Sequence, residues 1–355
     1  MTVAFYLPQF HPISENDEWW GKGFTEWTNV GKAKKLFPGH YQPKVPKDLG
    51  YYDLRLKESR IAQAMLAKEY GIDGFNYWHY WFGGGRTLLE GPLTKVINED
   101  LDIKIPFALA WANHSWTGIW NNEPSRKLLE QKYPGRHDMV NHFSYCLNAF
   151  KDKRYIRKNG HLLFTIYRPL DLKNCEEFLD TWRDLAVENG FKGFYFVGIS
   201  NQPKEEFQRI KALGFDAVNS FGLKDGINKS VGLRKYFDGF SRKFFGGGLK
   251  LSAYDYGKVM RKFNNEIDIL EDVVPTILPN WDTSPRSGKR GLILKDSSPD
   301  RFKVHLKKVK SIVDAKKNKL VFLKSWNEWA EGNYMEPDLR YGCEILEVYR
   351  DVFGE

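Results

Sequence analysis

Short apolar runs rich in β-branched and aromatic residues recur along the chain, and most are separated by stretches with the spacing of an amphipathic helix. The eight runs are Val3–Leu7, Gly74–Trp78, Pro106–Trp111, Leu162–Tyr167, Phe194–Ile199, Ala217–Phe221, Val273–Leu278 and Leu320–Lys324. The helical stretches are Glu58–Tyr70, Leu89–Asn98, Met139–Phe150, Glu176–Asn189, Glu205–Leu213, Tyr254–Leu270, Asp300–Asp314 and Ile345–Phe353. Strands that alternate with helices pair in parallel, and eight such units close a barrel. We therefore predict an α/β fold that is a single (β/α)8 TIM-type barrel.

The connection between strands six and seven of this barrel is predicted to carry a longer insertion. It covers Gly222–Ala253 and contains the glycine-rich segment Phe244–Gly248. No linker, internal repeat or change of composition divides the sequence, and 355 residues are enough to bury a full core. Residues 1–355 are therefore expected to form one domain.

Polar and aromatic residues follow seven of the predicted strands. The active site of a TIM barrel is built from the loops at the C-terminal ends of its strands, so these residues should meet at one rim. They are Gln9, His11, His79, Trp81, Asn113, Trp116, Arg168, Asn201, Asn280, Trp281, Asp282, Asn327, Glu328 and Glu331. Rings combined with amide, guanidinium and carboxylate groups suit a sugar, which offers both apolar faces and hydroxyls.

Aromatic residues make up 15% of the chain, with 12 Trp, 18 Tyr and 25 Phe. Many of the Trp and Tyr residues stand beside Asn, His, Asp or Glu in the sequence rather than inside apolar runs. This mixture favours a wall that stacks on sugar rings, although ordinary amphipathic packing remains an alternative. The residues expected to line one groove are Trp20, Trp27, Tyr80, Trp116 and Trp281.

The segment Ser325–Gly332 places Glu328 and Glu331 three residues apart at the end of the eighth strand, between two tryptophans. Partial desolvation and mutual repulsion push the pKa values of two neighbouring carboxyls apart, which leaves one ionised base and one protonated acid. Glycosidic bond chemistry requires this division. The alternative is a pair of solvated or capping glutamates at the start of a helix.

The charge balance is +9, from 54 basic and 45 acidic residues. Its lysines occur in short runs, which indicates a solvated basic surface, with weak peripheral attraction to anionic membranes or acidic glycans as the alternative. Three scattered cysteines form neither a zinc-binding spacing nor a disulfide framework. No signal peptide and no apolar stretch of membrane-spanning length is visible. A cytoplasmic location is the expectation.

Several of these motifs also carry a family resemblance. The segment Asn327–Gly332, with Glu336 beyond it, resembles the catalytic signature of the glycoside hydrolase family 99 endo-mannosidases. The rest resembles the bacterial WbsX-like branch, often described as lipopolysaccharide or O-antigen biosynthesis proteins or glycosyltransferases. The stretches that carry this likeness are Tyr6–Pro12, Trp19–Trp27, Gly39–Pro43, Tyr77–Phe82, Trp111–Asn113 and Trp281–Arg286. In the loop after the third strand, His114 and Gly118-Ile119 depart from the pattern of that branch.

The resemblance implies a catalytic barrel that acts on glycosidic bonds of a bacterial surface polysaccharide with retention, without metal or other cofactor. Glu328 would be the base on the sugar 2-hydroxyl, which forms a 1,2-anhydro sugar, and Glu331 the acid and then the base that activates water. Together with the rim pattern, it gives the residues expected to bind substrate. They are Trp20, Glu26, Trp27, Tyr77, His79, Tyr80, Trp111, Asn113, Trp116, Trp281, Asp282, Arg286, Trp326, Asn327 and Glu336.

Two other functions stay open: a glycosyltransferase of lipopolysaccharide biosynthesis, and a glycan-binding module without turnover on the same fold. A nucleotide-sugar transferase usually carries an acidic D-x-D metal site, and the one such string, Asp100-Leu101-Asp102, precedes the third strand at the opposite end of the barrel. The aromatic residues accompany acids and amides rather than basic residues, which argues against nucleic-acid binding.

Overall fold

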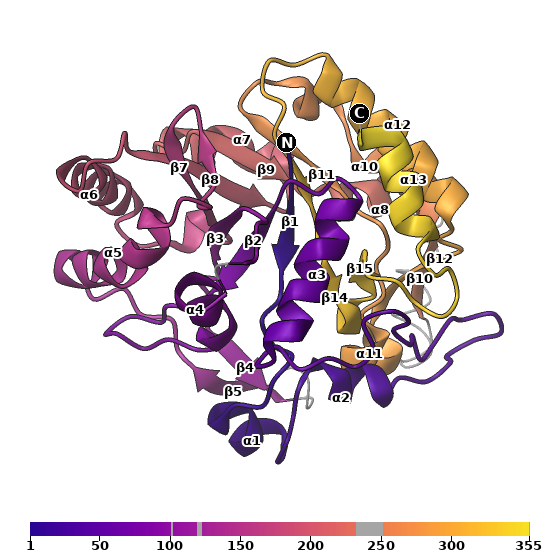
Figure 1. Cartoon of the computed structure of the whole chain (residues 1–355). Helices are drawn as coiled ribbons and strands as arrows, with labels where there is room; N and C mark the ends of the chain where they lie inside the picture. Colours follow the sequence, from indigo (N-terminus) through magenta and orange to yellow (C-terminus); the bar gives the residue numbers. More distant parts are fainter. Residues whose placement is uncertain (101, 119–122, 232–250, 355) are drawn as a thin grey trace.

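The computed structural model of the protein describes residues 1–100, 102–118, 123–231 and 251–354. Eight parallel strands form its centre (Figure 1). They are β1 (Thr2–Tyr6), β2 (Gly74–His79), β3 (Phe107–Trp111), β7 (His161–Ile166), β8 (Phe194–Ser200), β9 (Ala217–Ser220), β11 (Val273–Ile277) and β13 (Val321–Leu323). Their order is β3-β2-β1-β13-β11-β9-β8-β7, and pairing of β3 with β7 closes the ring. The predicted (β/α)8 barrel is confirmed, with each strand within one or two residues of its expected place.

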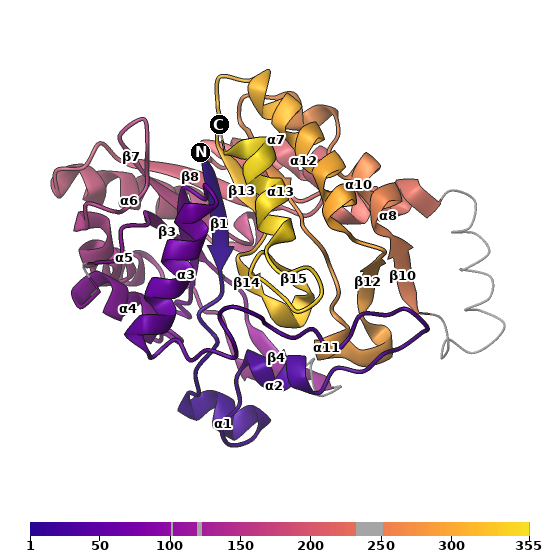
Figure 2. The same ribbon diagram turned by 45° about the vertical axis from the view of Figure 1, so that its right-hand side comes forward.

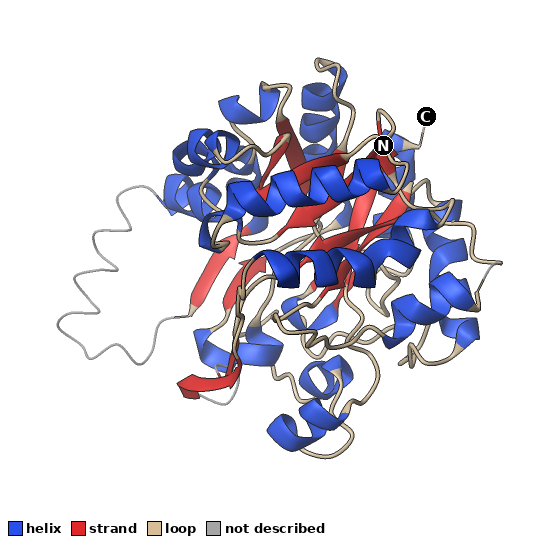
Figure 3. Cartoon of the chain, turned by 90° about the vertical axis from the view of Figure 1, so that its left-hand side faces the viewer, coloured by secondary structure: helices blue, strands red, loops and turns tan. Residues whose placement is uncertain are grey.

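Helices surround the strands on the outside, as Figure 3 shows. Those between or after barrel strands are α3 (Lys57–Glu69), α4 (Gly91–Asn98), α5 (Arg136–Lys151), α6 (Cys175–Glu188), α7 (Pro203–Ala212), α12 (Pro299–Asp314) and α13 (Glu344–Phe353). Shorter elements lie on the side toward which the β1 arrow points in Figure 1, at the C-terminal ends of the strands. They include α1 (Ser14–Trp20), α2 (Glu26–Gly31), α11 (Ser284–Ser287), and the antiparallel pair β4 (Trp116–Gly118) and β5 (Glu123–Leu129). The N and C termini lie at the opposite end.

The connection from β9 to β11 is the site of the predicted insertion. Its described parts are α8 (Leu223–Val231), β10 (Ser252–Asp255), α10 (Tyr256–Phe263) and the 3-10 turn η3 (Glu266–Ile269). Strand β10 pairs in parallel with β12 (Leu292–Lys295), outside the barrel (Figure 2). The glycine-rich segment Phe244–Gly248 lies outside the described residues.

The single helix predicted for Tyr254–Leu270 is wrong. The side chain of Asp255 accepts a hydrogen bond from the backbone N–H of Lys258 and starts α10 there. The backbone is extended at Asn264, and Asn265 caps η3 with its own side chain. Asn and Asp compete with helical hydrogen bonds in this way, so the polar pair ends the helix early.

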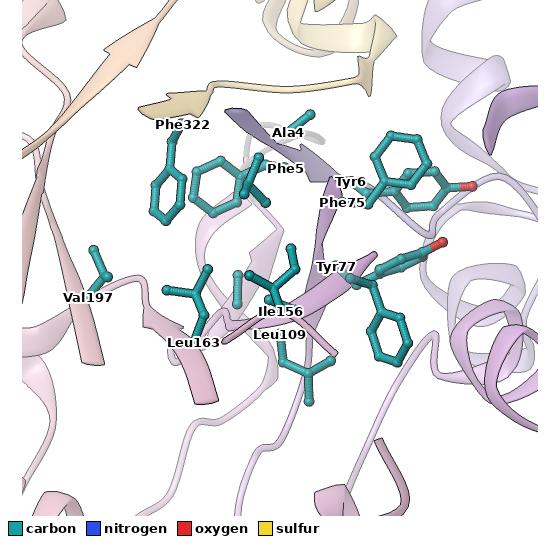
Figure 4. Close-up of a cluster of buried hydrophobic side chains, with 14 of the residues drawn as sticks. Ala4, Phe5, Tyr6, Phe75, Tyr77, Leu109, Ile156, Leu163, Val197 and Phe322 are labelled. Carbon is teal, nitrogen blue, oxygen red and sulfur yellow. The ribbon is translucent and has the colours of Figure 1, made fainter. Parts of the chain in front are cut away.

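Side chains that alternate along the strands divide into an inner and an outer layer (Figure 4). Phe5 packs edge-on against Phe322, with ring centroids 5.2 Å apart, inside the barrel. Its neighbour Tyr6 points the other way, and the ring centroids of Tyr6 and Tyr77 are 4.4 Å apart. The hydroxyl of Tyr6 donates a hydrogen bond to the side chain of Gln63 on α3. Adjacent residues of one strand therefore belong to different surroundings, which decides which aromatic residues reach the rim.

Among the described residues, no helix combines the length and apolar character needed to cross a membrane.

Candidate active site

A cavity of about 780 Å³ opens at the C-terminal ends of the strands. It is lined by Leu7, Gln9, Trp20, Trp78, Tyr80, Ala112, Asn113, His114, Ser115, Trp116, Thr117, Leu128, Gln131, Tyr133, Tyr167, Arg168, Asp171, Arg286, Lys324, Glu328 and Glu331. These residues follow β1, β2, β3, β7, β11 and β13, or lie on α1 and the β4–β5 pair. The location is where TIM barrels place their active sites.

Both predicted catalytic glutamates face this cavity, and the backbone around them is tightly held. Glu328 belongs to the short strand β14 (Asn327–Glu328), and its N–H donates a 2.9 Å hydrogen bond to Ser325 Oγ. Glu331 ends the turn η5 (Trp329–Glu331). Gly332 follows with a φ of +60°, and a Cβ there would stand 2.6 Å from Lys44 Nζ. Only glycine fits at this bend, which presents Glu331 to the cavity.

Arg286 of α11 connects the two glutamates to a third, Glu26. Its Nη1 lies 2.5 Å from Oε1 of Glu331 and 3.7 Å from Oε2 of Glu328, and its Nη2 lies 3.0 Å from Oε2 of Glu26. The Arg286 side chain is 10% exposed and that of Glu26 is 0% exposed. Burial opposes the charge of Arg286, yet attraction to the three glutamates raises its pKa. A fixed positive charge therefore sits between the carboxyls.

Electrostatics separate the two cavity glutamates. Burial raises the pKa of Glu328 well above its ordinary value, and the nearby charge of Glu331 raises it further, while Arg286 opposes the shift. Glu331 makes the close ion pair with Arg286. In the free site the geometry therefore favours a proton on Glu328 and a charge on Glu331.

Three of the five predicted wall residues line the cavity together: Trp20, Tyr80 and Trp116. Trp116 packs edge-on against Tyr80, with centroids 5.3 Å apart. The other two do not line it. Trp27 packs against Phe10, Tyr51, Tyr52 and Trp329, and its indole N–H donates to the carbonyl of Tyr52. Trp281 packs against Phe221, with centroids 5.5 Å apart, and lies beside Lys324.

Four more predicted contacts are buried away from the cavity, and the placement expected for them is wrong. Tyr77 and Trp111 point outward from their strands, Tyr77 against Tyr6 and Trp111 against His142 of α5. Trp326 is fully buried beside Phe75. The predictions for Tyr77 and Trp111 fail because side chains alternate along a strand, and both residues fall on the helix-facing side.

His79 is the fourth, and it also points outward, into a buried group with His142 and Cys146. The two Nε2 atoms are 2.8 Å apart, and Sγ of Cys146 is 3.7 Å from Nε2 of His79. The three potential metal-ligand atoms lie within 4.8 Å of one another. Burial lowers the pKa of both histidines, so both are neutral at pH 7 and one can donate to the other. The 2.8 Å separation fits this hydrogen bond.

The predicted polar contacts Asp282, Asn327 and Glu336 also lie outside the cavity, where they support it. Asn327 bonds both backbone groups of Leu7. Asp282 lines a second, smaller cavity, where its carboxylate accepts a hydrogen bond from Gln42 and lies 2.9 Å from His40 Nε2.

Glu336 is also buried outside the cavity. Burial raises its pKa to about 7, and hydrogen bonds from Trp329, Gln63 and Tyr52 partly oppose this shift. Among the predicted polar contacts, Asn113 and Arg286 line the cavity, and Glu26 acts from behind Arg286.

Sequence reasoning missed other residues that face the cavity, among them Trp78, His114, Tyr133, Tyr167 and Lys324. Trp78 is the last residue of the predicted strand Gly74–Trp78, and it lines the cavity. His114 was noted only as a departure from the family pattern, and burial lowers its pKa to about 4. Lys324 ends the eighth predicted strand, so its position at a strand end was an available signal.

Comparison with known proteins now identifies the family. The family model described as "Glycosyltransferase WbsX" matches residues 2–349. The chain belongs to the WbsX family. Two proteins named "Uncharacterized protein WxcX", from two strains of Xanthomonas campestris pv. campestris, are each 35% identical over 353 residues, or 99% of this chain and 49% of theirs. This WbsX-family chain therefore spans about half the length of those relatives.

Solved structures with the same fold confirm the barrel. One is a GH99 endo-alpha-mannosidase from Bacteroides thetaiotaomicron in complex with bis-tris-propane, with a TM-score of 0.61 and 14% identity over 99% of this chain and 97% of that one. Another, named "Glycoside hydrolase-like protein", has a TM-score of 0.59 and 16% identity, covering 99% and 93%. The family and fold expected from the sequence motifs are thus confirmed.

Proposed function

We propose that this WbsX-family chain is a retaining glycoside hydrolase or transglycosylase that acts on a bacterial surface polysaccharide of the O-antigen, lipopolysaccharide or capsule type. One observation carries the proposal: Glu328 and Glu331 face the same cavity, and Arg286 holds them together. Membership of a family named for glycosyl transfer, and a fold shared with glycoside hydrolases, support a carbohydrate-active enzyme. Tryptophan and tyrosine rings along the cavity offer stacking surfaces for sugars.

In the proposed mechanism, Glu328 accepts the proton of the sugar 2-hydroxyl while O2 attacks C1 and the glycosidic bond breaks. Glu331 protonates the departing oxygen. Glu331, now a carboxylate, takes a proton from water, which attacks C1 of the 1,2-anhydro sugar, and Glu328 returns its proton to O2. Two inversions at C1 give net retention. A second sugar hydroxyl in place of water would give transfer.

The free site favours the proton on Glu328, whereas the first step requires it on Glu331. Because the charge of Glu331 is among the causes that raise the pKa of Glu328, we infer that the pair shares one proton. A sugar 2-hydroxyl that donates to Glu328 stabilises its carboxylate form. We propose that substrate binding moves the shared proton to Glu331 and sets both groups for reaction.

The shared proton gives a prediction for pH. Because the pKa of Glu328 is raised, the pair keeps its proton well above the ordinary carboxyl range and loses it as pH rises through the raised value. We expect kcat/KM to persist above pH 5 and then fall on the alkaline side. Glu331→Gln removes the neighbouring charge, so the pKa of Glu328, followed by 13C NMR of labelled glutamate, should move down toward 4.5. A wild-type Glu328 that titrates near 4.5 would contradict the shared proton.

The direct test is incubation with purified bacterial surface polysaccharides, with the anomeric protons of the first product followed by NMR. Retention at C1 supports the mechanism, and inversion excludes it. Adding an acceptor sugar distinguishes transfer from hydrolysis, because transfer yields a longer product. Binding without any turnover would favour the glycan-binding module.

A second candidate, a nucleotide-sugar glycosyltransferase, is suggested by the printed family name. The acidic string considered for it is engaged elsewhere. Asp100 is buried in an ion pair with Arg60, 2.6 Å from its Nε, and Asp102 pairs with Lys57 at 3.1 Å. Neither carboxylate lines the cavity. Release of a nucleoside diphosphate from a nucleotide sugar would nevertheless establish this activity.

The aromatic wall gives a further prediction. Trp116→Ala should weaken binding of the glycan found in the NMR experiment by roughly tenfold, because a stacking surface on the cavity is lost. Its free energy of unfolding should also fall, but by less than that of Trp27→Ala, because Trp116 packs edge-on against three rings, those of Trp19, Tyr80 and Phe82. Trp27→Ala is the contrasting variant: it should lose about 3 kcal/mol of stability in urea denaturation, because Trp27 packs against four aromatic rings. The opposite pattern would place Trp27, rather than Trp116, in the binding wall.

A further inference from the structure

Lys324 reaches the floor of the cavity through a ring of aromatic side chains. It follows β13 directly, and its Nζ lies 4.7–6.0 Å from four ring centroids. The rings belong to Phe5 of β1, Trp78 of β2, Phe221 after β9 and Trp281 after β11. Four separate strands therefore fix the position of one ammonium group. Cation–π attraction stabilises the ammonium charge among these rings, but it supplies no hydrogen-bond acceptor for the N–H groups of Lys324.

Within the part of the chain that the structure describes, this ammonium has no hydrogen-bond acceptor and no carboxylate within 4.0 Å. The other cations of the cavity are engaged. Arg286 pairs with three glutamates, and Arg168 lies 3.2 Å from Asp171. The N–H donors of Lys324 are thus available to a ligand in the cavity that this residue lines. A desolvated charge with unused donors is unfavourable until a ligand supplies the acceptor.

The charge balance around Lys324 favours an anion. Arg286 is shared among Glu331, Glu328 and Glu26, and burial favours the protonated form of Glu328. Burial lowers the pKa of Lys324, and attraction to Glu331 and Glu328 opposes this. Among the described cations that line the cavity, Lys324 is thus the one with no carboxylate within 4.0 Å. A basic chain, +9 overall, would also attract a polyanion from solution.

We propose that Lys324 binds a carboxylate carried by the sugar in this cavity, so that the substrate is an acidic polysaccharide that contains uronic acid residues. This rests on the proposed function in one respect, that the cavity is the glycan site. A singly charged carboxylate matches one ammonium, whereas a doubly charged phosphate would bring a second negative charge into a cavity that Glu328 and Glu331 already line. Trp78, which lines the cavity beside Lys324, is placed to pack on the ring that carries the carboxylate.

The test compares matched pairs of methyl glycosides that differ only at C6: glucuronide against glucoside, galacturonide against galactoside, and mannuronide against mannoside. Binding is measured by saturation-transfer NMR and tryptophan fluorescence in the Glu331→Gln variant, in which cleavage of unactivated glycosides is expected to be slow. At least one uronide should bind about tenfold more tightly than its neutral partner, the effect of one charge-assisted hydrogen bond. A second arm uses 4,6-pyruvate ketals of the neutral hexosides. Preference in that arm alone would assign the carboxylate to a ketal substituent.

Adding Lys324→Met should reduce this preference to near one, because methionine keeps the unbranched stem among the rings and removes the charge. The matched control is Lys303→Met on α12, which is 39% exposed and outside the cavity, and it should keep the preference. The melting temperature of Lys324→Met should not fall, which separates lost recognition from lost folding.

Equal binding of acidic and neutral glycosides, no binding of any acidic glycoside, or a preference that survives Lys324→Met would each overturn the assignment. The result is independent of the proposed catalysis. Uronide preference without any turnover would retain the carboxylate site and reject the hydrolase, whereas turnover of a neutral polysaccharide would do the reverse.

Discussion

Glu331→Gln is expected to lower turnover of a natural glycan by about 10²–10⁴, the usual effect of removing a general acid, or roughly 3–5 kcal/mol of barrier. Glutamine keeps the shape of the side chain but supplies no proton to the departing oxygen. Substrates with activated aryl leaving groups need little protonation, so their cleavage should be largely spared. Steady-state kinetics with a natural and an aryl substrate, side by side, measure the difference.

Glu328→Gln should instead disable cleavage of both substrates, because no base then accepts the proton of the 2-hydroxyl. A 2-deoxy substrate should be inert with the wild type for the same reason. Glu344→Gln, at the exposed start of α13, is the matched control and should retain full activity. If both cavity variants keep wild-type turnover on a confirmed substrate, the pair is not catalytic.

Arg286→Met should destabilise the protein by about 3–5 kcal/mol, as expected when a buried ion pair loses one partner. The reason is Glu26, which is fully buried and lies 3.0 Å from the guanidinium. Burial raises the pKa of Glu26, and Arg286 is the main group that opposes the shift. Without Arg286, the buried carboxyl must hold a proton or leave a charge without its partner. Urea denaturation at constant pH measures the loss.

The sign of the pH dependence follows from Glu26. In Arg286→Met its folded pKa rises further above the unfolded value, so stability falls as pH rises from the unfolded pKa toward the folded one. The deficit should be smaller at pH 5 than at pH 8. Adding Glu26→Gln removes the carboxyl and should recover part of the loss. A single variant as stable as the wild type would show that the Glu26–Arg286 pair makes no net contribution.

The arrangement of the barrel could be predicted from the sequence because its signals are local. A parallel strand is a short apolar run, a helix repeats apolar positions every three or four residues, and each signal lies within a few neighbours. The same reasoning located Glu328 and Glu331, since a TIM barrel places residues after a strand at the C-terminal rim. It missed the break at Asn264-Asn265, where side-chain capping replaced a helix that the apolar spacing alone would continue.

The direction of each rim side chain was decided by tertiary structure. Tyr77 and Trp78 are neighbours with similar composition around them, yet Tyr77 packs among outer rings and Trp78 lines the cavity. A one-residue difference in register exchanges the two faces of a strand, and composition does not contain the register. For this reason clusters that mix aromatic and polar residues marked the correct loops but overstated how many members touch the cavity.

The sequence by itself determined the barrel, the family and the place of the glutamate pair, because each depends on residues close together in the chain. Tertiary structure alone decided the partners of those residues. Arg286 meets Glu26 across 260 positions, and the rings around Lys324 come from four strands. Such contacts produce no recognisable residue spacing in a single sequence, because closure of the barrel brings together strand ends that are far apart in the chain. The charge and pKa of each cavity group follow from those partners.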